Sequence, residues 1–182
     1  MACPELTTSR LKLRKWKAED FDVFAALNAD PEVMRYFPDT LTRTESDALA
    51  NRIQEQMEQS PLGLWALELK SNNRFIGFTG LAITRFEAHF TPCTEIGWRL
   101  TKAYWGHGYV TEAAQTVLEY AFTKLHLPEV VSFTVSENQR SRRVMERLGM
   151  HHNPTEDFDH PALPNDHPLR RHVLYRLNKK AQ

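Results

Sequence analysis

Two glycines one residue apart stand in "YWGHGYVTEAA", residues 104–114, directly before a helical pattern. Glycine is favoured where the backbone turns sharply or approaches another group closely. The first amides of a helix have no partner within it and carry a partial positive charge, which suits an anion. Gly106 and Gly108 therefore predict a phosphate cradle made of main-chain amides, although a tight strand-to-helix turn explains the same pattern.

The glycines do not complete either of two common phosphate-binding motifs. A P-loop requires Lys and then Ser or Thr after its last glycine, and this chain has Tyr109 and Val110. A dinucleotide-binding fingerprint requires a third glycine at position 111, which is Thr111. The motif alone therefore predicts an anion-binding site but does not identify the anion.

The elements around this loop alternate in type, which predicts an α/β fold. The predicted helices cover 18–29, 42–59, 108–125 and 138–149. The predicted strands cover 10–16, 62–70, 74–83, 94–100, 129–135 and 170–177, and a short turn is expected at 31–37. Thr42 and Glu45 form a capping-box pattern, and Asn138 and Gly149 are expected to cap and end the fourth helix. No linker is apparent, so one domain is expected over residues 1–182.

The bulk composition is that of an ordinary globular protein. Lys and Arg number 23, Asp and Glu number 23, and the formal net charge is zero, so no global field indicates a nucleic-acid or membrane partner. The N-terminal residues contain no apolar stretch long enough for a signal peptide or a membrane span. Cys3 and Cys93 are too few for a disulfide framework. We expect a cytoplasmic protein with reduced thiols.

At this point the chain resembles a known family. "WGHGYVTEA" resembles the acyl-CoA-binding segment of the GCN5-related N-acetyltransferases, the GNAT superfamily, and "VSENQRSRRVMERLGM" (135–150) resembles the asparagine-to-glycine motif that follows it. Within the superfamily the resemblance is to the RimJ/RimL-like branch, which acetylates protein N-termini and includes small-molecule acetyltransferases. It covers nearly the whole chain. It implies a GNAT fold: a mixed, mostly antiparallel central sheet splayed into a V between strands 94–100 and 129–135, flanked by helices.

The resemblance also implies a co-substrate, acetyl-CoA, lying in the V. Its pantetheine arm would bind the main chain of Trp98, Arg99 and Leu100, with an amide contacting Asn138. Its pyrophosphate would lie on the amides of Trp105, Gly106, His107, Gly108 and Tyr109. The family usually has Gln or Arg where this chain has Ala103, and the adjacent Lys102 is a substitute. The candidates for the adenosine 3′-phosphate are Arg140, Arg142 and Arg143, although an exposed basic helix face explains them equally well.

Acetyl transfer to an amine needs a group that accepts the amine's proton, a donor to the oxyanion and a proton for the departing thiolate. By alternation Glu95 shares a strand face with Gly97 and Arg99, and the family places a carboxylate there that faces the acceptor. An ion-paired surface glutamate is the competing explanation.

Asn138 caps a helix in either case, and the resemblance implies that the Ser141 hydroxyl points at the sulfur of the co-substrate. Met145 stands where many members have a tyrosine acid, so Ser141 or a water is the candidate acid.

Five of the eight histidines fall in residues 151–172, together with several acids. Their spacing matches no zinc pattern, so we expect no metal. Prolines predict a long loop there, which by resemblance borders the acceptor pocket.

The prediction is an acetyl-CoA-dependent N-acetyltransferase, monomer or homodimer, that acetylates a small-molecule or peptide amine. The alternative is a GNAT-fold module that binds acyl-CoA or another ligand without turnover, and a dinucleotide-binding protein is a distant third.

Overall fold

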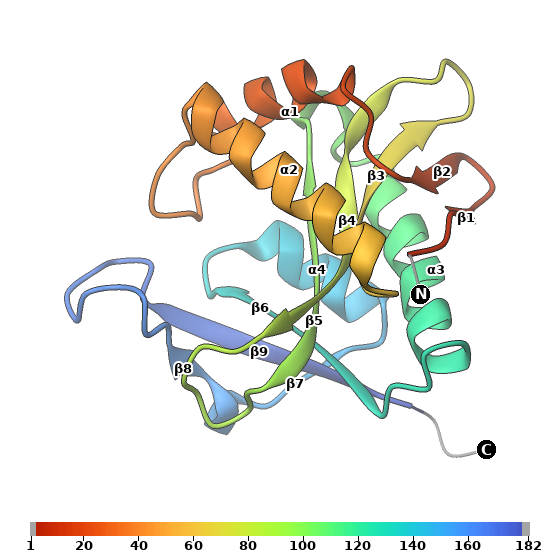
Figure 1. The fold of residues 1–182 in the computed structure, drawn as a ribbon. Coiled ribbons are helices and arrows are strands. Elements are labelled where there is room, and N and C mark those ends of the chain that lie inside the picture. The colour runs from red at the N-terminus through yellow and green to blue at the C-terminus, as the bar shows by residue number, and fades with distance from the viewer. Residues whose placement is uncertain (1–2, 180–182) are drawn as a thin grey trace.

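The computed structural model describes residues 3–179, which form one mixed sheet with helices on both faces (Figure 1). The strands are β1 Leu6–Thr7, β2 Leu11–Arg14, β3 Leu64–Leu69, β4 Phe75–Thr84, β5 Cys93–Leu100, β6 Glu129–Val135, β7 His151–His152, β8 Phe158–Asp159 and β9 Arg171–Asn178. The α-helices are α1 Asp20–Ala29, α2 Arg43–Gln59, α3 Tyr109–Thr123 and α4 Gln139–Arg147. The 3₁₀ turns are η1 Lys102–Tyr104 and η2 Pro154–Glu156.

The sheet is antiparallel except where β5 meets β6. Its order is β1-β2-β3-β4-β5-β6-β9-β7, with β8 also paired to β9. β4 and β5 pair along their length, from Gly77 opposite Leu100 to Thr84 opposite Cys93. β5 and β6 are parallel and have one register pair, Glu95 opposite Val131. The two strands therefore diverge after Glu95, and the predicted V is confirmed.

Local capping signals placed the helix ends correctly. Thr42 accepts from the Glu45 amide while the Glu45 side chain accepts from the Thr42 amide, which completes the capping box of α2. Asn138 caps α4 by accepting from the Ser141 amide at 3.3 Å. Gly149 follows α4 with φ +78°, the left-handed conformation that glycine adopts without a side-chain clash.

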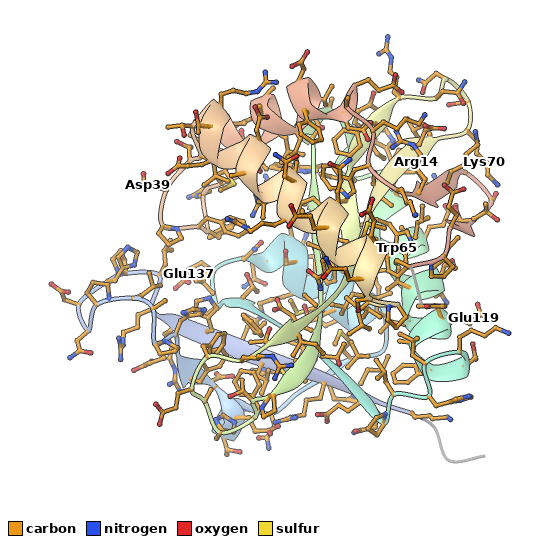
Figure 2. The ribbon with its side chains drawn as sticks, in the orientation of Figure 1. Arg14, Asp39, Trp65, Lys70, Glu119 and Glu137 are labelled. Carbon is orange, nitrogen blue, oxygen red and sulfur yellow. The ribbon has the colours of Figure 1, made fainter. Side chains whose placement is uncertain are left out.

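The core lies between the sheet and its helices. Figure 1 shows α1 and α2 on one face and α3 on the other. Trp65 is fully buried, stands edge-on to Tyr120 of α3 at 5.8 Å between ring centroids, and donates from Nε1 to the Pro4 carbonyl at 2.6 Å. The labelled Lys70 and Glu119 instead point outward (Figure 2). Burial of the large apolar side chains on both faces stabilises the packing of the helices against the V-shaped sheet.

The short strands were not predicted. The turn expected at 31–37 is present, but β1 was not foreseen. The predicted loop over residues 151–172 contains the two-residue strands β7 and β8, which both pair with β9. Such short strands lack enough residues to show an alternating pattern, and they form because β9 offers hydrogen-bonding partners distant in sequence.

Candidate active site

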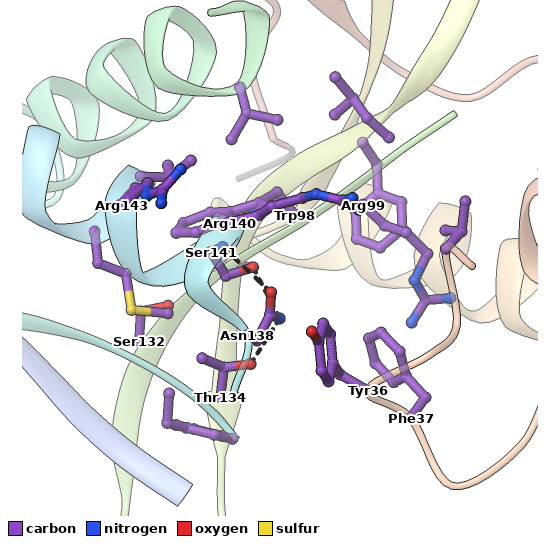
Figure 3. A pocket seen from close by; sticks show the side chains of 18 of the residues that line it. Tyr36, Phe37, Trp98, Arg99, Ser132, Thr134, Asn138, Arg140, Ser141 and Arg143 are labelled. Carbon is purple, nitrogen blue, oxygen red and sulfur yellow. Dashed lines mark hydrogen bonds between the residues drawn. The ribbon is translucent and has the colours of Figure 1, made fainter. Parts of the chain in front are cut away.

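A cavity of about 1010 Å³ occupies the opening between β5 and β6. Its walls come from β5, β6, the loop before α3, α4, and the segments after α1 and before β9. Figure 3 shows Asn138 and Ser141 on one side of it and Tyr36, Phe37 and Arg99 on the other. The predicted site residues that line it are Glu95, Trp98, Arg99, Leu100, Trp105, Gly106, Gly108, Tyr109, Asn138 and Ser141. His107, Lys102 and Arg142, which were also candidates, are not part of this lining.

The glycine loop leaves room and free amides at the N-terminus of α3. Gly106 and Gly108 have φ of +80° and +78°, and a Cβ built on Gly106 would meet no atom within 4 Å. Among residues 3–179, the amides of Gly106, His107 and Gly108 donate to no protein group. The Trp105 amide differs, because it donates to the Lys102 carbonyl at 3.1 Å and is not free for a phosphate.

Arg10 supports this loop from the side of β2. Its Nη1 donates to the His107 carbonyl at 3.0 Å, and its Nε pairs with Glu112 of α3 at 2.6 Å. The same guanidinium lies 4.5 Å from the centre of the Tyr109 ring. These contacts hold the loop against the first turn of α3, so its amides are oriented before any ligand arrives.

The exposed edge of β5 presents main-chain groups to the opening. The Thr101 amide donates to the Ile76 carbonyl of β4 at 3.0 Å. Backbone groups of successive strand residues turn to opposite edges, so Arg99 also faces β4, while Trp98 and Leu100 face the opening. The Leu100 carbonyl already accepts from the Trp105 indole at 2.9 Å. Trp98 therefore has an amide and a carbonyl available for a strand-like ligand.

Asn138 and Ser141 form one hydrogen-bonded unit at the start of α4 (Figure 3). Asn138 Oδ1 accepts from the Ser141 amide, which leaves Nδ2 to donate to Ser141 Oγ at 3.1 Å and to Thr134 Oγ1 at 2.9 Å. Because Oγ of Ser141 accepts in this unit, its own proton remains available for another group. The arrangement presents a hydroxyl donor to the cavity.

Glu95 lies in the cavity wall at the closed end of the V. The Thr84 hydroxyl donates to its Oε2 at 2.8 Å, and no ion pair involves Glu95 among the described residues, so the ion-paired alternative is not seen. Burial raises the pKa of Glu95 to about 7, against which the Thr84 hydrogen bond acts only in part. A carboxylate whose pKa lies close to neutral pH is suited to accept and release protons there.

The basic residues of α4 do not act alike. Arg140 lies 4.2 Å above the Trp105 ring and 3.6 Å from Glu32, which also pairs with Lys102. Arg142 is directed away from the cavity: it donates to the Tyr175 hydroxyl at 3.2 Å and to a backbone carbonyl. Arg140 and Arg143 line the cavity and stay candidates for phosphate contact, whereas Arg142 does not.

Several other residues that line the cavity were missed by sequence reasoning. Tyr36 and Phe37 come from the turns after α1, and Phe133, His160 and His172 surround the far end near β9. No local motif marks these residues, since they meet only through the sheet. Within residues 3–179, no three His, Cys, Asp or Glu side chains come together as a metal site.

Comparison with known proteins decides the family. The model of the acetyltransferase (GNAT) domain matches residues 10–151. The chain belongs to the GNAT acetyltransferase family. It is 31% identical over 148 residues to the uncharacterized N-acetyltransferase YnaD of Bacillus subtilis (strain 168), covering 80% of this chain and 81% of YnaD. Family membership implies that acetyl-CoA is the acetyl donor.

Solved GNAT structures share the whole architecture. A GNAT-family acetyltransferase from Bacillus anthracis superposes with a TM-score of 0.79 at 25% identity, covering 97% of this chain and 99% of that one. Mycobacterium smegmatis RimJ, solved in complex with CoA-disulfide, has a TM-score of 0.72 at 18% identity, covering 92% and 81%. At 18% identity, the likeness to RimJ shows only that the two proteins share a fold. None of the helices described here is long and apolar enough to cross a bilayer.

Proposed function

We propose that this GNAT protein transfers an acetyl group from acetyl-CoA to a primary amine by direct attack in a ternary complex. The observation that carries the proposal is that one cavity contains both a carboxylate with a raised pKa, Glu95, and a hydroxyl with an available proton, Ser141. The amine nitrogen attacks the thioester carbonyl, the nitrogen–carbon bond forms, and the carbon–sulfur bond breaks. Glu95, directly or through a water, takes the amine's proton. The Ser141 hydroxyl donates a proton to the departing thiolate and regains one from a water in the cavity, so CoA leaves as the thiol.

The donor would lie along the β5 side of the opening. The amide and carbonyl of Trp98 would bind the pantetheine arm, and the amides of Gly106, His107, Gly108 and Tyr109 would hold the pyrophosphate. Arg143 would meet the 3′-phosphate. The absence of Gln or Arg at Ala103 matters little in this arrangement, because the cradle is main chain. The RimJ/RimL-like sequence resemblance adds peptide N-termini to the acceptors considered.

The test is an acceptor screen with the whole protein and acetyl-CoA, following release of CoA thiol. The panel contains peptides with N-terminal Ser, Ala and Asp, free amino acids, polyamines and amino sugars. Steady release with one amine class, with the N-acetylated product identified by mass spectrometry, supports the proposal. Calorimetric binding of acetyl-CoA without turnover of any acceptor would instead favour a ligand-binding module.

A further inference from the structure

Arg99 is a cation in the acceptor half of the cavity with no carboxylate partner. Its Nη1 donates to Asn28 Oδ1 at 2.5 Å, and its guanidinium carbon lies 4.1 Å from the centre of the Phe37 ring and 5.7 Å from that of Phe78 (Figure 3). Nε is buried and has no hydrogen-bond partner in the described chain. No ion pair among residues 3–179 includes Arg99. The Arg99 side chain is held by the Phe37 ring and by Asn28, but no carboxylate neutralises its charge.

Arg14 shows how this fold treats a buried arginine that serves structure alone. It pairs with Asp20 at 2.7 Å and with Glu68 at 2.6 Å, so two carboxylates offset the cost of burying one guanidinium. Burial without such partners lowers the pKa of Arg99 to about 10. A buried cation costs free energy unless it is paired. Nothing within the described chain supplies that pairing at Arg99.

We propose that Arg99 binds the carboxylate of the acceptor, so that the substrate of the proposed acetyltransferase is an amino acid whose amine reaches Glu95. This inference rests on the proposed function for the identity of the reacting amine. A guanidinium edge with Nε and Nη2 free matches a carboxylate through two parallel hydrogen bonds. Nε is closed off from water in this structure, so carboxylate binding includes a small shift of the side chains around it.

The path from Arg99 to Glu95 is open. Both residues lie on one face of β5, four positions apart, which separates their Cα atoms by about 13 Å. Gly97 lies between them, and a Cβ built there would have no neighbour closer than Glu95 Oε1 at 3.9 Å. Both residues line the cavity, so a ligand that contacts both must hold its amine and its carboxylate well apart. A linear ω-amino acid fits the spacing better than an α-amino acid.

The rest of the acceptor side favours a single negative charge. Phe133, Leu163 and Leu169 are apolar, and burial lowers the pKa of both His160 and His172 below the usual histidine value. The other arginines of the cavity come from α4, on the side of Asn138 and Ser141. One guanidinium therefore faces one carboxylate, and a doubly charged phosphate would be left partly unpaired.

The experiment compares ω-amino acids with their neutral carboxamides at equal chain length. Glycine, 4-aminobutanoate and 6-aminohexanoate are paired with glycinamide, 4-aminobutanamide and 6-aminohexanamide, and kcat/KM is taken from CoA release. The parent should favour the longer acids over their amides by about tenfold or more, the effect of one charge-assisted bidentate contact. Arg99→Gln should abolish that preference and Arg99→Lys should keep part of it. Arg43→Gln, at an exposed arginine of α2, is the matched control.

A second readout does not depend on turnover. Calorimetry with the CoA complex measures the binding of 6-acetamidohexanoate and of its carboxamide, and acetyl-CoA binding shows that each variant is folded. Acid-selective binding that Arg99→Gln removes supports the carboxylate site even where no amine is acetylated, a result that would refute only the proposed reaction. Equal turnover and equal binding of acids and amides would overturn the Arg99 assignment and leave the acetyltransferase proposal standing.

Discussion

Glu95 and Val131 are register partners at the one backbone pair that joins β5 to β6 in the described sheet. The strands separate beyond this pair, so Glu95 lies at the point where the two strands part. Its partner strand continues to Thr134, whose hydroxyl accepts from Asn138 and so connects to Ser141. The splay of the sheet therefore places the base candidate, on β5, and the acid candidate, on α4 just after β6, at one opening.

Glu95→Gln tests the base. The substitution keeps the shape and removes the charge, so turnover near neutral pH should fall on the order of a hundredfold. The deficit should shrink as pH rises, because more of the amine arrives deprotonated. The parent should also lose activity below about pH 7, where Glu95 becomes protonated. The measurement is a pair of pH–rate profiles, of the parent and of the variant, at saturating acetyl-CoA. Parallel profiles would show that Glu95 is not the base.

The same variant makes a prediction about stability. The pKa of Glu95 is about 7 in the fold against an ordinary 4.5, so the folded state binds more protons between these values and loses stability as pH rises through them. Glu95→Gln should therefore stabilise the protein at pH 8 by about 1–2 kcal/mol, less than the full shift implies because the side chain is partly exposed. The gain should vanish near pH 4.5. Urea unfolding at both pH values measures it, and a variant less stable than the parent at pH 8 contradicts the burial argument.

Gly106→Val tests the phosphate cradle. Its Cβ would enter space that is empty of protein atoms, so acetyl-CoA affinity should fall at least about tenfold through exclusion of the phosphate. Valine at positive φ is also strained, and Gly149→Val is the matched control, because Gly149 has φ +78° and an equally open Cβ direction outside the cavity. Equal acetyl-CoA affinities of the two variants by calorimetry would show that Gly106 and Gly108 serve only the turn.

Ser141→Ala tests the donor to the leaving group. Turnover should fall on the order of a hundredfold while acetyl-CoA binding changes little, since the hydroxyl acts on the departing sulfur in the transition state. Thr134→Val is the comparison variant, because it removes the other hydroxyl that Asn138 contacts and reports any effect of loosening that unit. Equal losses in the two variants would assign the effect to Asn138 positioning.

Arg14→Met tests the buried ion network at the sheet edge. Removing the guanidinium leaves the buried Asp20 without an ion-pair partner and Glu68 with only Lys12 and Lys17, which should cost about 3–5 kcal/mol at pH 7. Burial alone raises the pKa of Glu68, but hydrogen bonds from Arg14 and Lys12 outweigh it and hold that pKa at about 2. The parent's stabilisation from this group is present above pH 4.5 and is lost as pH falls toward 2. Urea unfolding across this range should show the slope in the parent and a weaker one in the variant.

Much of the fold was readable from the sequence because its signals are local. The residues of β6 were predicted to their ends, since a run of β-branched residues lies between a proline and a helix cap. The caps at Thr42, Asn138 and Gly149 were also readable, because each is an interaction within one turn of chain. The same holds for the turn at Gly106 and Gly108, where positive φ restricts the choice of residue.

The tertiary structure alone decided what those elements face. Alternation placed Glu95 and Arg99 on one strand face, but it could not show that Glu95 has Thr84 and no ion pair, or that Arg99 lacks a carboxylate. It also could not direct Arg142 toward Tyr175 or bring His172 to the cavity. These outcomes depend on contacts between residues far apart in the chain, whose burial sets both their pKa values and their available partners, and no short sequence pattern records that environment.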